Sequence, residues 1–160
     1  MSTIHFDPAI LLADPERRRR ILPVLEAALH AVDPGPAVRA ALRRTGDRLA
    51  VGEAVYDLDQ FQRVLLLGFG KAAVAIGLAA AEVLGDRLTA GLLLTKHGHA
   101  AGADALPASI AVLEAGHPVP DAAGVQAAQR IAALAEGATA RDLVLCLISG
   151  GGSALLSLPA

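Results

Sequence analysis

An apolar stretch that runs straight into a glycine cluster is the feature that most restricts the fold of this chain. Asp142–Ile148 is almost uninterrupted apolar sequence, and the glycine-rich segment Ser149–Ser153 follows it. An apolar run of this kind is typical of a strand buried on both faces of a parallel sheet. Glycines allow a sharp turn, and Ser153 is expected to cap a helix beginning near Ala154. Strand, turn and helix N-terminus together predict an anion site built from main-chain N–H groups.

From Arg63 onward, strand-like and helix-like segments alternate. The expected strands are Val64–Leu67, Gly91–Thr95, Ser109–Leu113 and Leu143–Ile148, and the expected helices are Lys71–Leu84 and Asp121–Glu136. This alternation predicts an α/β fold: a mostly parallel sheet with helices on both faces, a Rossmann-like three-layer sandwich. In such sheets ligands bind at the carboxyl ends of the strands, where the glycine, lysine and histidine clusters of this chain fall.

The first third of the chain is expected to be mainly helical. Its expected elements are a helix from Asp14 to about Val32 that Pro23 kinks or restarts, a second helix over Pro36–Arg44, and a small hairpin around Gly52 and Glu53. A proline at the first helical position and an acidic residue in the first turn mark the start of the first helix.

Composition limits the kind of protein that this chain can be. The 160 residues are 54% hydrophobic, which excludes disorder, and only 2% aromatic, so the core is expected to consist of Ala, Leu, Val and Ile. The net charge of −2 provides no general attraction to nucleic acid or to an anionic membrane. Cys146 is the single cysteine and is expected to be a small buried residue. Met1–Asp7 lacks the pattern of a signal peptide, so a cytoplasmic location is expected.

One segment raises the alternative of a membrane helix. Val64–Leu84 is mostly apolar and, at roughly 20 residues, long enough to cross a bilayer. However, Lys71 and Glu82 place charges inside it, and Gly68 and Gly70 interrupt it where a turn is expected. A strand, a turn and a helix are therefore the preferred interpretation.

The turn after the first core strand contains a lysine in an unusual place. Gly68–Ala73 fails the P-loop pattern but fits a loose dinucleotide fingerprint, with Ala73 in the place of the third glycine. Lys71 is expected in the first turn of a helix, where a cation opposes the helix dipole unless an anion is bound. Because Lys96 suits a 2′-phosphate, an NADP site stays open as an alternative.

Histidines and an aspartate follow the second and third predicted strands. His117 stands between Gly116 and two prolines and is expected to contact a ligand, whereas Asp121 is expected to cap the next helix. His97 and His99 have a spacing found in metal sites, but no nearby residue completes a ligand set. They are interpreted as loop residues, and no metal ligand is assigned.

Three motifs in this order give the chain a family resemblance. They are Gly68-Phe69-Gly70-Lys71-Ala72, Glu114-Ala115-Gly116-His117-Pro118-Val119-Pro120-Asp121 and Leu147-Ile148-Ser149-Gly150-Gly151-Gly152-Ser153-Ala154-Leu155-Leu156. With them, the chain resembles the N-terminal region of the glycerate 2-kinases of bacteria and animals, the family that has a MOFRL domain at its C-terminus. The resemblance spans roughly Arg18 to Pro159. It implies that residues 1–160 are the N-terminal α/β domain of a longer protein, incomplete at its C-terminus and without the C-terminal domain.

The resemblance implies a reaction and a set of roles. The family phosphorylates D-glycerate on its 2-hydroxyl group with ATP and Mg²⁺. By position, Lys71 would hold the substrate carboxylate or the transferred phosphoryl group, Ser149–Ser153 would cradle phosphate, and His117 would line the cleft. The expected site residues are Lys71 as the catalytic residue, with Gly68, Gly70, His117, Ser149, Gly150, Gly151, Gly152 and Ser153 in binding.

Two other functions stay open beside the kinase. The loose fingerprint suits an NAD(P)-dependent hydroxypyruvate reductase, a label that some relatives carry. The chain also lacks candidates for the later arginine and acidic residues that family members use, so a non-catalytic fragment or binding module is the third alternative. The expected partner is a small molecule, glycerate, with no nucleic acid and no membrane, and a second copy or a completing chain is left open.

Overall fold

The computed structural model describes residues 14–158, which form parts of two compact units, 1–33 and 34–160. The described part of the first unit, 14–33, contains one helix, α2 (Pro15–Ala31). Its N-cap is Asp14, whose carboxylate accepts the main-chain N–H of Glu16 at 2.9 Å. Pro23 lies inside the helix without ending or restarting it, and no residue of α2 is buried. Met1–Asp7, on which the expectation about a signal peptide rests, lies outside the described residues.

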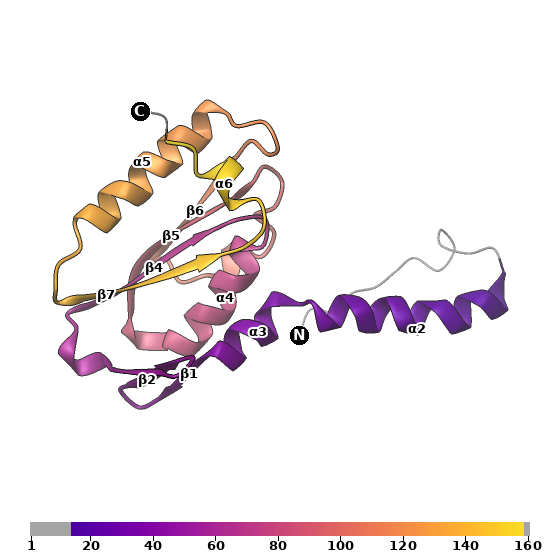
Figure 1. Cartoon of the computed structure of the whole chain (residues 1–160), viewed down its shortest axis with the longest axis horizontal. Coiled ribbons are helices and arrows are strands. Elements are labelled where there is room, and N and C mark those ends of the chain that lie inside the picture. Colours follow the sequence, from indigo (N-terminus) through magenta and orange to yellow (C-terminus); the bar gives the residue numbers. More distant parts are fainter. Residues whose placement is uncertain (1–13, 159–160) are drawn as a thin grey trace. The chain divides into compact units, whose positions relative to one another are not determined.

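The second unit alternates strands and helices along most of its length (Figure 1). Its elements are α3 (Pro34–Ala41), β1 (Leu42–Thr45), β2 (Arg48–Val51), β3 (Ala54–Asp57), η1 (Leu58–Gln60), β4 (Arg63–Phe69), α4 (Ala73–Leu84), η2 (Gly85–Arg87), β5 (Leu88–Lys96), η3 (Ala103–Ala105), β6 (Ile110–Ala115), α5 (Ala122–Glu136), β7 (Asp142–Ile148) and α6 (Gly152–Leu155), where η marks a 3₁₀ helix.

The larger sheet is parallel throughout, as the sequence predicts. Its four strands within residues 14–158 lie in the order β6-β5-β4-β7. The chain moves outward from β4 through β5 to β6, and α5 then carries it back to the other side of β4. The strand order therefore reverses between β4 and β7. In open α/β sheets, the carboxyl ends of the strands at such a reversal form the usual ligand crevice.

Helices cover both faces of this sheet, which confirms the expected three-layer arrangement. On one face α4 packs its alanines against leucines of β4, β5 and β7, and α3 packs against α4. On the other face, Ala127 and Ile131 of α5 and Leu155 of α6 pack on Leu67, Leu92 and Leu94. Both cores consist almost entirely of Leu, Ala, Ile and Val, as the scarcity of aromatic residues predicts.

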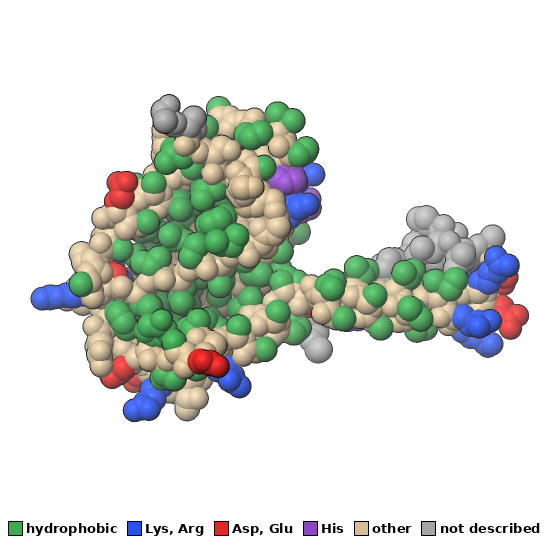
Figure 2. All heavy atoms as spheres, viewed as in Figure 1, with side chains coloured by type: hydrophobic (Ala, Val, Ile, Leu, Met, Phe, Trp, Pro, Cys, Tyr) green, Lys and Arg blue, Asp and Glu red, His purple; other side chains and the backbone are tan. Residues whose placement is uncertain are grey.

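The prediction that β7 is buried on both faces is wrong. Leu143 and Leu145 are buried, but Val144 and Ile148 are 37% and 66% exposed, and Cys146 is exposed as well. Among the described strands β7 pairs only with β4, and α5 makes its main sheet contacts with β6, at the opposite edge. Figure 2 shows apolar side chains open to view between α5 and β7. An apolar sequence alone cannot tell an edge strand with one open face from a central strand.

The segment before the parallel sheet contains a strand that the sequence analysis assigned to a helix. The second helix was expected over Pro36–Arg44, but α3 ends at Ala41, and β1 pairs antiparallel with β2, which also pairs with β3. Leu42, Leu49 and Leu58 are buried in the core on the α4 side. This burial selects the strand, since tertiary packing overrides weak local helix propensity.

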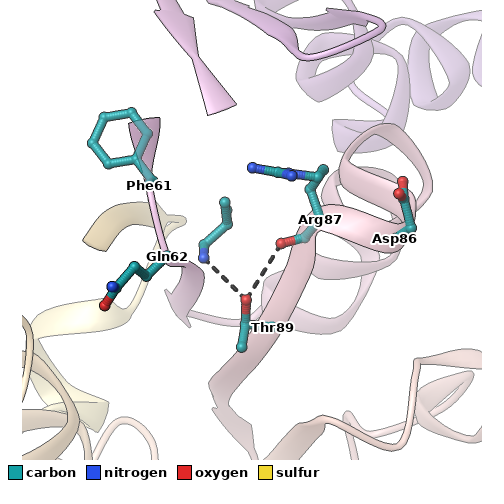
Figure 3. A pocket seen from close by; sticks show the side chains of 6 residues that line it. Phe61, Gln62, Asp86, Arg87 and Thr89 are labelled. Atoms are coloured by element: carbon teal, nitrogen blue, oxygen red, sulfur yellow. Dashed lines mark hydrogen bonds between the residues drawn. The ribbon is translucent and has the colours of Figure 1, made fainter. Parts of the chain in front are cut away.

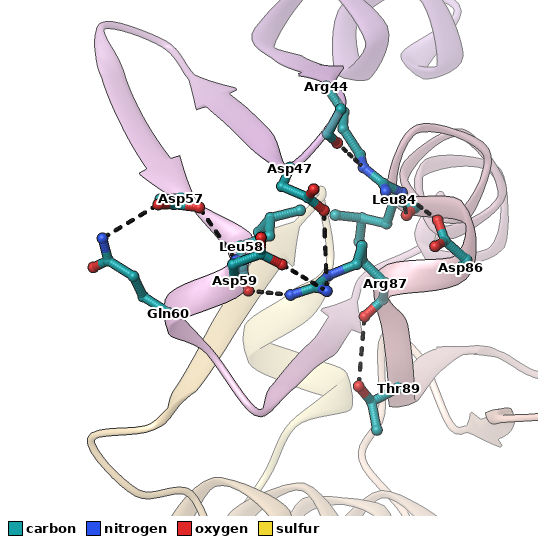
Figure 4. A network of polar contacts seen from close by, with 11 residues as sticks. Arg44, Asp47, Asp57, Leu58, Asp59, Gln60, Leu84, Asp86, Arg87 and Thr89 are labelled. Carbon is teal, nitrogen blue, oxygen red and sulfur yellow. Dashed lines mark hydrogen bonds and ion pairs between the residues drawn. The ribbon is translucent and has the colours of Figure 1, made fainter.

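Two arginines attach this small antiparallel sheet to the parallel sheet (Figure 4). The Arg44 guanidinium donates to the carbonyl oxygen of Leu84, at the end of α4, and to Asp86 at 2.7 Å. Arg87 donates to the carbonyl oxygen of Leu58 and to Asp59 at 3.3 Å. These contacts all lie at the amino ends of the parallel strands, so they leave the carboxyl edge free for a site.

The segment Val64–Leu84 forms most of β4, a turn and α4. This is the strand, turn and helix that the sequence analysis preferred to a membrane helix. None of the helices within residues 14–158 is long and apolar enough to cross a membrane.

Candidate functional site

The turns after β4 and β7 are bonded directly to each other. The main-chain N–H of Lys71 donates to the carbonyl oxygen of Gly150 at 3.0 Å, and that of Ala72 donates to Ser149 Oγ at 3.1 Å. The Ser149 N–H also donates to the Phe69 carbonyl at 3.0 Å. The lysine turn and the serine–glycine turn are 77 residues apart in the chain, and they form one structure at the reversal of strand order.

Two glycines permit this close approach. Gly70 has a φ of 126°, and a Cβ on it would lie 2.5 Å from the carbonyl oxygen of Ser149. Gly151 has a φ of 89°, and a Cβ there would lie 2.8 Å from His117 Nε2 and 3.4 Å from Lys71 Cε. Both positions therefore exclude a side chain by backbone conformation and by space. The contacts at Gly151 also bring one member of each of the three sequence motifs to the same point.

Free main-chain donors are found in only one of the two turns. The N–H groups of Gly70, Lys71, Ala72 and Ala73 donate to Leu94 O, Gly150 O, Ser149 Oγ and Gly70 O, respectively. In contrast, the N–H groups of Gly150 and Gly151 donate to no other group within residues 14–158. Main-chain N–H groups that lack a partner in the protein are the ones that can bind an anion. The turn after β7, rather than the turn after β4, offers such donors.

Several predicted site residues have a local role that differs from the expected one. Lys71 is exposed and lies in the turn before α4, two residues before Ala73, the first residue of that helix. The N–H of Lys71 is bonded to Gly150 rather than within the helix. Ser153 lies inside α6 and caps no helix; the N-cap is Gly151, which makes no side-chain cap bond. Gly68 is buried in β4, where a Cβ would lie 2.6 Å from Leu93 Cδ2. Gly68 therefore serves packing within the sheet.

A histidine–aspartate pair lies next to this site, and the sequence analysis missed it. His97 Nε2 lies 2.8 Å from Asp121 Oδ2, although His97 had been interpreted as a loop residue. Asp121 also caps α5 as predicted, through a bond of 2.9 Å from the Gly124 N–H to Oδ1. His97 directly follows β5 and Asp121 precedes α5 in the segment after β6. Because β5 and β6 are adjacent and parallel, the segments that follow them lie side by side. The strand order, once known, therefore indicates that His97 and Asp121 can pair.

The Asp121 carboxylate is strongly stabilised in its ionised form. The pKa of Asp121 is lowered to about 2, with the hydrogen bond to His97 as the largest cause and the main-chain N–H groups of Gly116 and Gly124 as the next. The other acid at this edge, Glu114, accepts the N–H groups of Gly98 at 2.7 Å and His99 at 3.2 Å. Both carboxylates are thus already engaged with groups of the protein.

The charge at this edge suits an anionic ligand. The basic side chains that follow the parallel strands here are those of Lys71, Lys96, His97, His99 and His117. Figure 2 shows histidine and basic side chains gathered at this end of the sheet. No group of three or more His, Cys, Asp or Glu side chains within residues 14–158 is arranged to hold a metal ion. The lysines and the free N–H groups of Gly150 and Gly151 therefore favour an anion as the ligand of this site.

A small pocket lies at the opposite end of the parallel strands, near their amino ends. It is lined by Phe61, Gln62, Val64, Asp86, Arg87 and Thr89, near the starts of β4 and β5 (Figure 3). Thr89 Oγ1 accepts the Val64 N–H at 3.1 Å and donates to the Arg87 carbonyl at 3.4 Å. The Thr89 hydroxyl is therefore already bonded to groups of the protein. Ligands of parallel sheets bind at the carboxyl ends of the strands. The pocket is thus not assigned to the candidate site.

Comparison with known families identifies the domain. The family described as "Domain of unknown function (DUF4147)" matches residues 20–160, nearly the whole chain. The chain belongs to this family. It is also 36% identical to the D-glycerate 2-kinase of Thermotoga maritima over 148 residues, 91% of this chain and 31% of that protein. The crystal structure of a glycerate kinase from the same organism superposes on 91% of this chain with a TM-score of 0.68 and 32% identity, covering 31% of that structure.

A second kind of relative carries another name. A putative hydroxypyruvate reductase of Agrobacterium vitis is 43% identical over 98 residues, which is 61% of this chain and 21% of that protein. This match covers less of the chain than the glycerate kinase matches do. The chain spans less than a third of the length of these relatives. Together, the comparisons confirm the resemblance to the glycerate 2-kinases and the α/β fold.

Proposed function

We propose that this chain is the N-terminal α/β part of an enzyme that transfers a phosphoryl group from ATP to D-glycerate, with 2-phosphoglycerate as the product. The observation that carries the proposal is the convergence at Gly151. Lys71 and His117 approach this glycine from two other motifs, and the free N–H groups of Gly150 and Gly151 lie at the same reversal of strand order. Similarity to the glycerate kinases supports the choice of substrate.

The reaction requires mainly positioning and charge neutralisation. The 2-hydroxyl group of glycerate loses its proton to solvent and its oxygen forms a bond to the terminal phosphorus of ATP. The bond from that phosphorus to the bridging oxygen breaks, its electron pair stays on that oxygen, and ADP leaves. Such a transition state is stabilised by groups that hold the phosphoryl oxygens and the acceptor in line. We assign phosphate binding to the free N–H groups of Gly150 and Gly151, supported by the Ser149 and Ser153 hydroxyls.

Lys71 contributes the fixed positive charge of this part of the site. Its ammonium group is assigned to the glycerate carboxylate or the transferred phosphoryl group, and His117 is assigned to ligand contact beside it. The tight turn at Gly70 and the bond from the Lys71 N–H to Gly150 fix the main chain from which the side chain extends. Gly70 and Gly152 are assigned to shaping the two turns that form the site, whereas Gly68 packs within β4.

The family resemblance also implies Mg²⁺, and the residues described here do not fit a metal site of their own. Mg²⁺ is commonly bound by one or two carboxylates together with phosphate oxygens. The carboxylates of this edge, Glu114 and Asp121, are engaged by main-chain N–H groups and by His97. No step of the reaction is therefore assigned to a metal bound by these residues.

The kinase proposal is tested with the natural protein that contains this chain. ADP formation is coupled to a colour or absorbance change in the presence of ATP, Mg²⁺ and D-glycerate. Lys71→Ala is expected to lower kcat/KM by about 10²- to 10³-fold, as the loss of one charge-stabilising group does in other enzymes. Arg130→Ala, an exposed change on α5, is the matched loss of a basic side chain and is expected to leave activity unchanged. Unchanged turnover in Lys71→Ala would overturn the role of this lysine.

The reductase alternative is supported by the name of one class of relatives and opposed by the turn after β4. A dinucleotide fingerprint uses free main-chain N–H groups at the start of the helix for the pyrophosphate. Here the N–H groups of the turn itself, Gly70–Ala72, and of Ala73, the first residue of α4, are all bonded within the protein. Oxidation of NADPH by hydroxypyruvate without ATP, followed at the nicotinamide absorbance band, would favour the reductase over the kinase.

The third alternative, a non-catalytic binding module, is separated by calorimetry. If the 160-residue chain binds ATP or glycerate, and Lys71→Ala weakens the binding, the chain carries part of an active site. If it binds neither ligand and the natural protein shows no turnover, the binding-module interpretation gains.

A further inference from the structure

Asp121 makes more contacts than a helix cap requires. Capping of α5 uses one carboxylate oxygen, Oδ1, which accepts the Gly124 N–H at 2.9 Å. The other oxygen, Oδ2, lies 2.8 Å from His97 Nε2, and the carboxylate also lies against Gly116, where a Cβ would be 3.1 Å from Oδ2. One side chain thus joins the loop after β5, the turn after β6 and the start of α5.

The loop that carries His97 is already held by other bonds. The His97 N–H donates to the Ala115 carbonyl at 3.0 Å, and Glu114 Oε1 accepts the N–H groups of Gly98 and His99. These contacts fix the main chain of the loop without Asp121. The bond to Asp121 therefore has a different effect: it fixes the orientation of the His97 imidazole.

The close contact with Gly116 connects Asp121 to the residue that contacts the proposed phosphate turn. Gly116 directly precedes His117, and His117 Nε2 would lie 2.8 Å from a Cβ on Gly151. The turn leaves little room for adjustment, since a Cβ on Gly116 would lie 2.6 Å from the Val119 carbonyl oxygen and 3.0 Å from Asp121 Cγ. A change in the Asp121 contact is thus transmitted to the position of His117.

We propose that Asp121 is a positioning residue of the site, which holds His117 against the Gly150–Gly151 turn through its close contact with Gly116 and sets the orientation of the His97 ring. The proposal rests on the kinase function for its effect on turnover, but the geometry on which it depends can be measured in the absence of any activity. Residues that orient groups contacting a ligand typically change activity by about 10- to 100-fold when they are removed.

A serine at this position separates positioning from capping. Serine is as good an N-cap as aspartate, so Asp121→Ser is expected to keep the α5 cap. Its side chain is one carbon shorter and carries one oxygen, so it cannot bond both His97 and Gly124 while it also contacts Gly116. Asp14→Ser, the same change at the N-cap of α2, is the matched control. Asp121→Ala removes cap and positioning contacts together.

The expected results differ for the two roles. If Asp121 positions the histidines, Asp121→Ser unfolds at nearly the same temperature as the parent chain, whereas the imidazole ¹⁵N and ¹H signals of His97 and His117 shift. In the natural protein that contains this chain, kcat then falls by about 10- to 100-fold. Asp14→Ser changes neither the signals nor kcat.

The proposal is overturned if Asp121→Ser leaves the signals of both histidines, and kcat, at the values of the parent. Failure of the kinase function is recognised separately, because the parent protein then shows no turnover. In that case the histidine signals of the 160-residue chain still decide between positioning and capping.

Discussion

At the scale of single residues, the site depends on positions where no side chain fits. Gly151 has its main chain in the left-handed region and lies against both His117 and Lys71. Its neighbour Gly150 has open space around the place of a Cβ and no positive φ. Gly150 and Gly151 are therefore not equivalent, although the sequence alone does not distinguish the two glycines.

Gly151→Ala is expected to destabilise the chain by about 1–3 kcal/mol, because it forces a Cβ into a strained main-chain region and into contact with His117. Gly150→Ala is the matched control, with an expected change close to zero. Urea unfolding followed by circular dichroism measures both. Equal stability of the two variants would contradict the strain assigned to Gly151.

Asp142 gives the chain a specific acid sensitivity. Its buried carboxylate accepts two bonds from the Arg63 guanidinium, at 2.8 and 2.7 Å, and two from Thr139. These contacts, the Arg63 bond first, hold the pKa of Asp142 well below its ordinary value. A carboxyl whose pKa is lower in the folded than in the unfolded state stabilises the fold above its unfolded pKa, and this contribution is lost as the pH falls.

We expect the parent chain to lose stability as the pH falls below the ordinary aspartate pKa of 3.8. Asp142→Asn is expected to be less stable at neutral pH and to depend less on pH in the acid range. Asp104→Asn removes an exposed carboxylate and serves as the control. Thermal unfolding from pH 7 down to pH 2 measures the three proteins, and parallel curves for the parent and Asp142→Asn would exclude this role for Asp142.

At the scale of elements, β7 is an almost uniformly apolar strand with one buried face and one exposed face. Leu145 is 8% exposed and packs in the core on the α4 side, whereas the adjacent Val144 is 37% exposed on the open face of the sheet. Strand residues alternate between the two faces, so neighbouring residues probe different environments. An apolar strand at the edge of a sheet also favours association with other chains.

Val144→Lys is therefore expected to leave the fold intact and to reduce concentration-dependent association of the 160-residue chain, measured by analytical ultracentrifugation. Leu145→Lys, one residue away, places a charge in the core and is expected to unfold the chain. Similar behaviour of the two variants would contradict the one-sided burial of β7.

The elements that the sequence predicted well are those with several independent signals. The helix over Asp121–Glu136 has a capping residue and is observed with Asp121 as its N-cap. The boundary between α3 and β1 was wrong, because Leu42–Thr45 has a weak local pattern and its strand conformation depends on pairing with β2. Local signals predict elements whose ends are marked by caps and glycines, and pairing decides the rest.

At the scale of the whole molecule, the chain divides into two units, residues 1–33 and 34–160. The helix of the first unit has no buried residue, so it adds little to the free energy of folding of the second. Removal of residues 1–33 is expected to leave the unfolding temperature of the remainder within a few degrees of that of the whole chain. Calorimetry measures this, and a loss of cooperative unfolding in 34–160 would contradict the independence of the second unit.

The sequence by itself determined the alternation of strands and helices, the parallel sheet and the three glycine-rich and histidine-rich motifs that face one edge. These features depend on local patterns of hydrophobicity and on residues with particular backbone preferences. Only the tertiary structure decided which strand lies at the edge, that the Lys71 turn is bonded to the Ser149–Gly150 turn, and that His97 pairs with Asp121. These features join residues that are distant in the chain, and the order in which the strands pair is what brings them together.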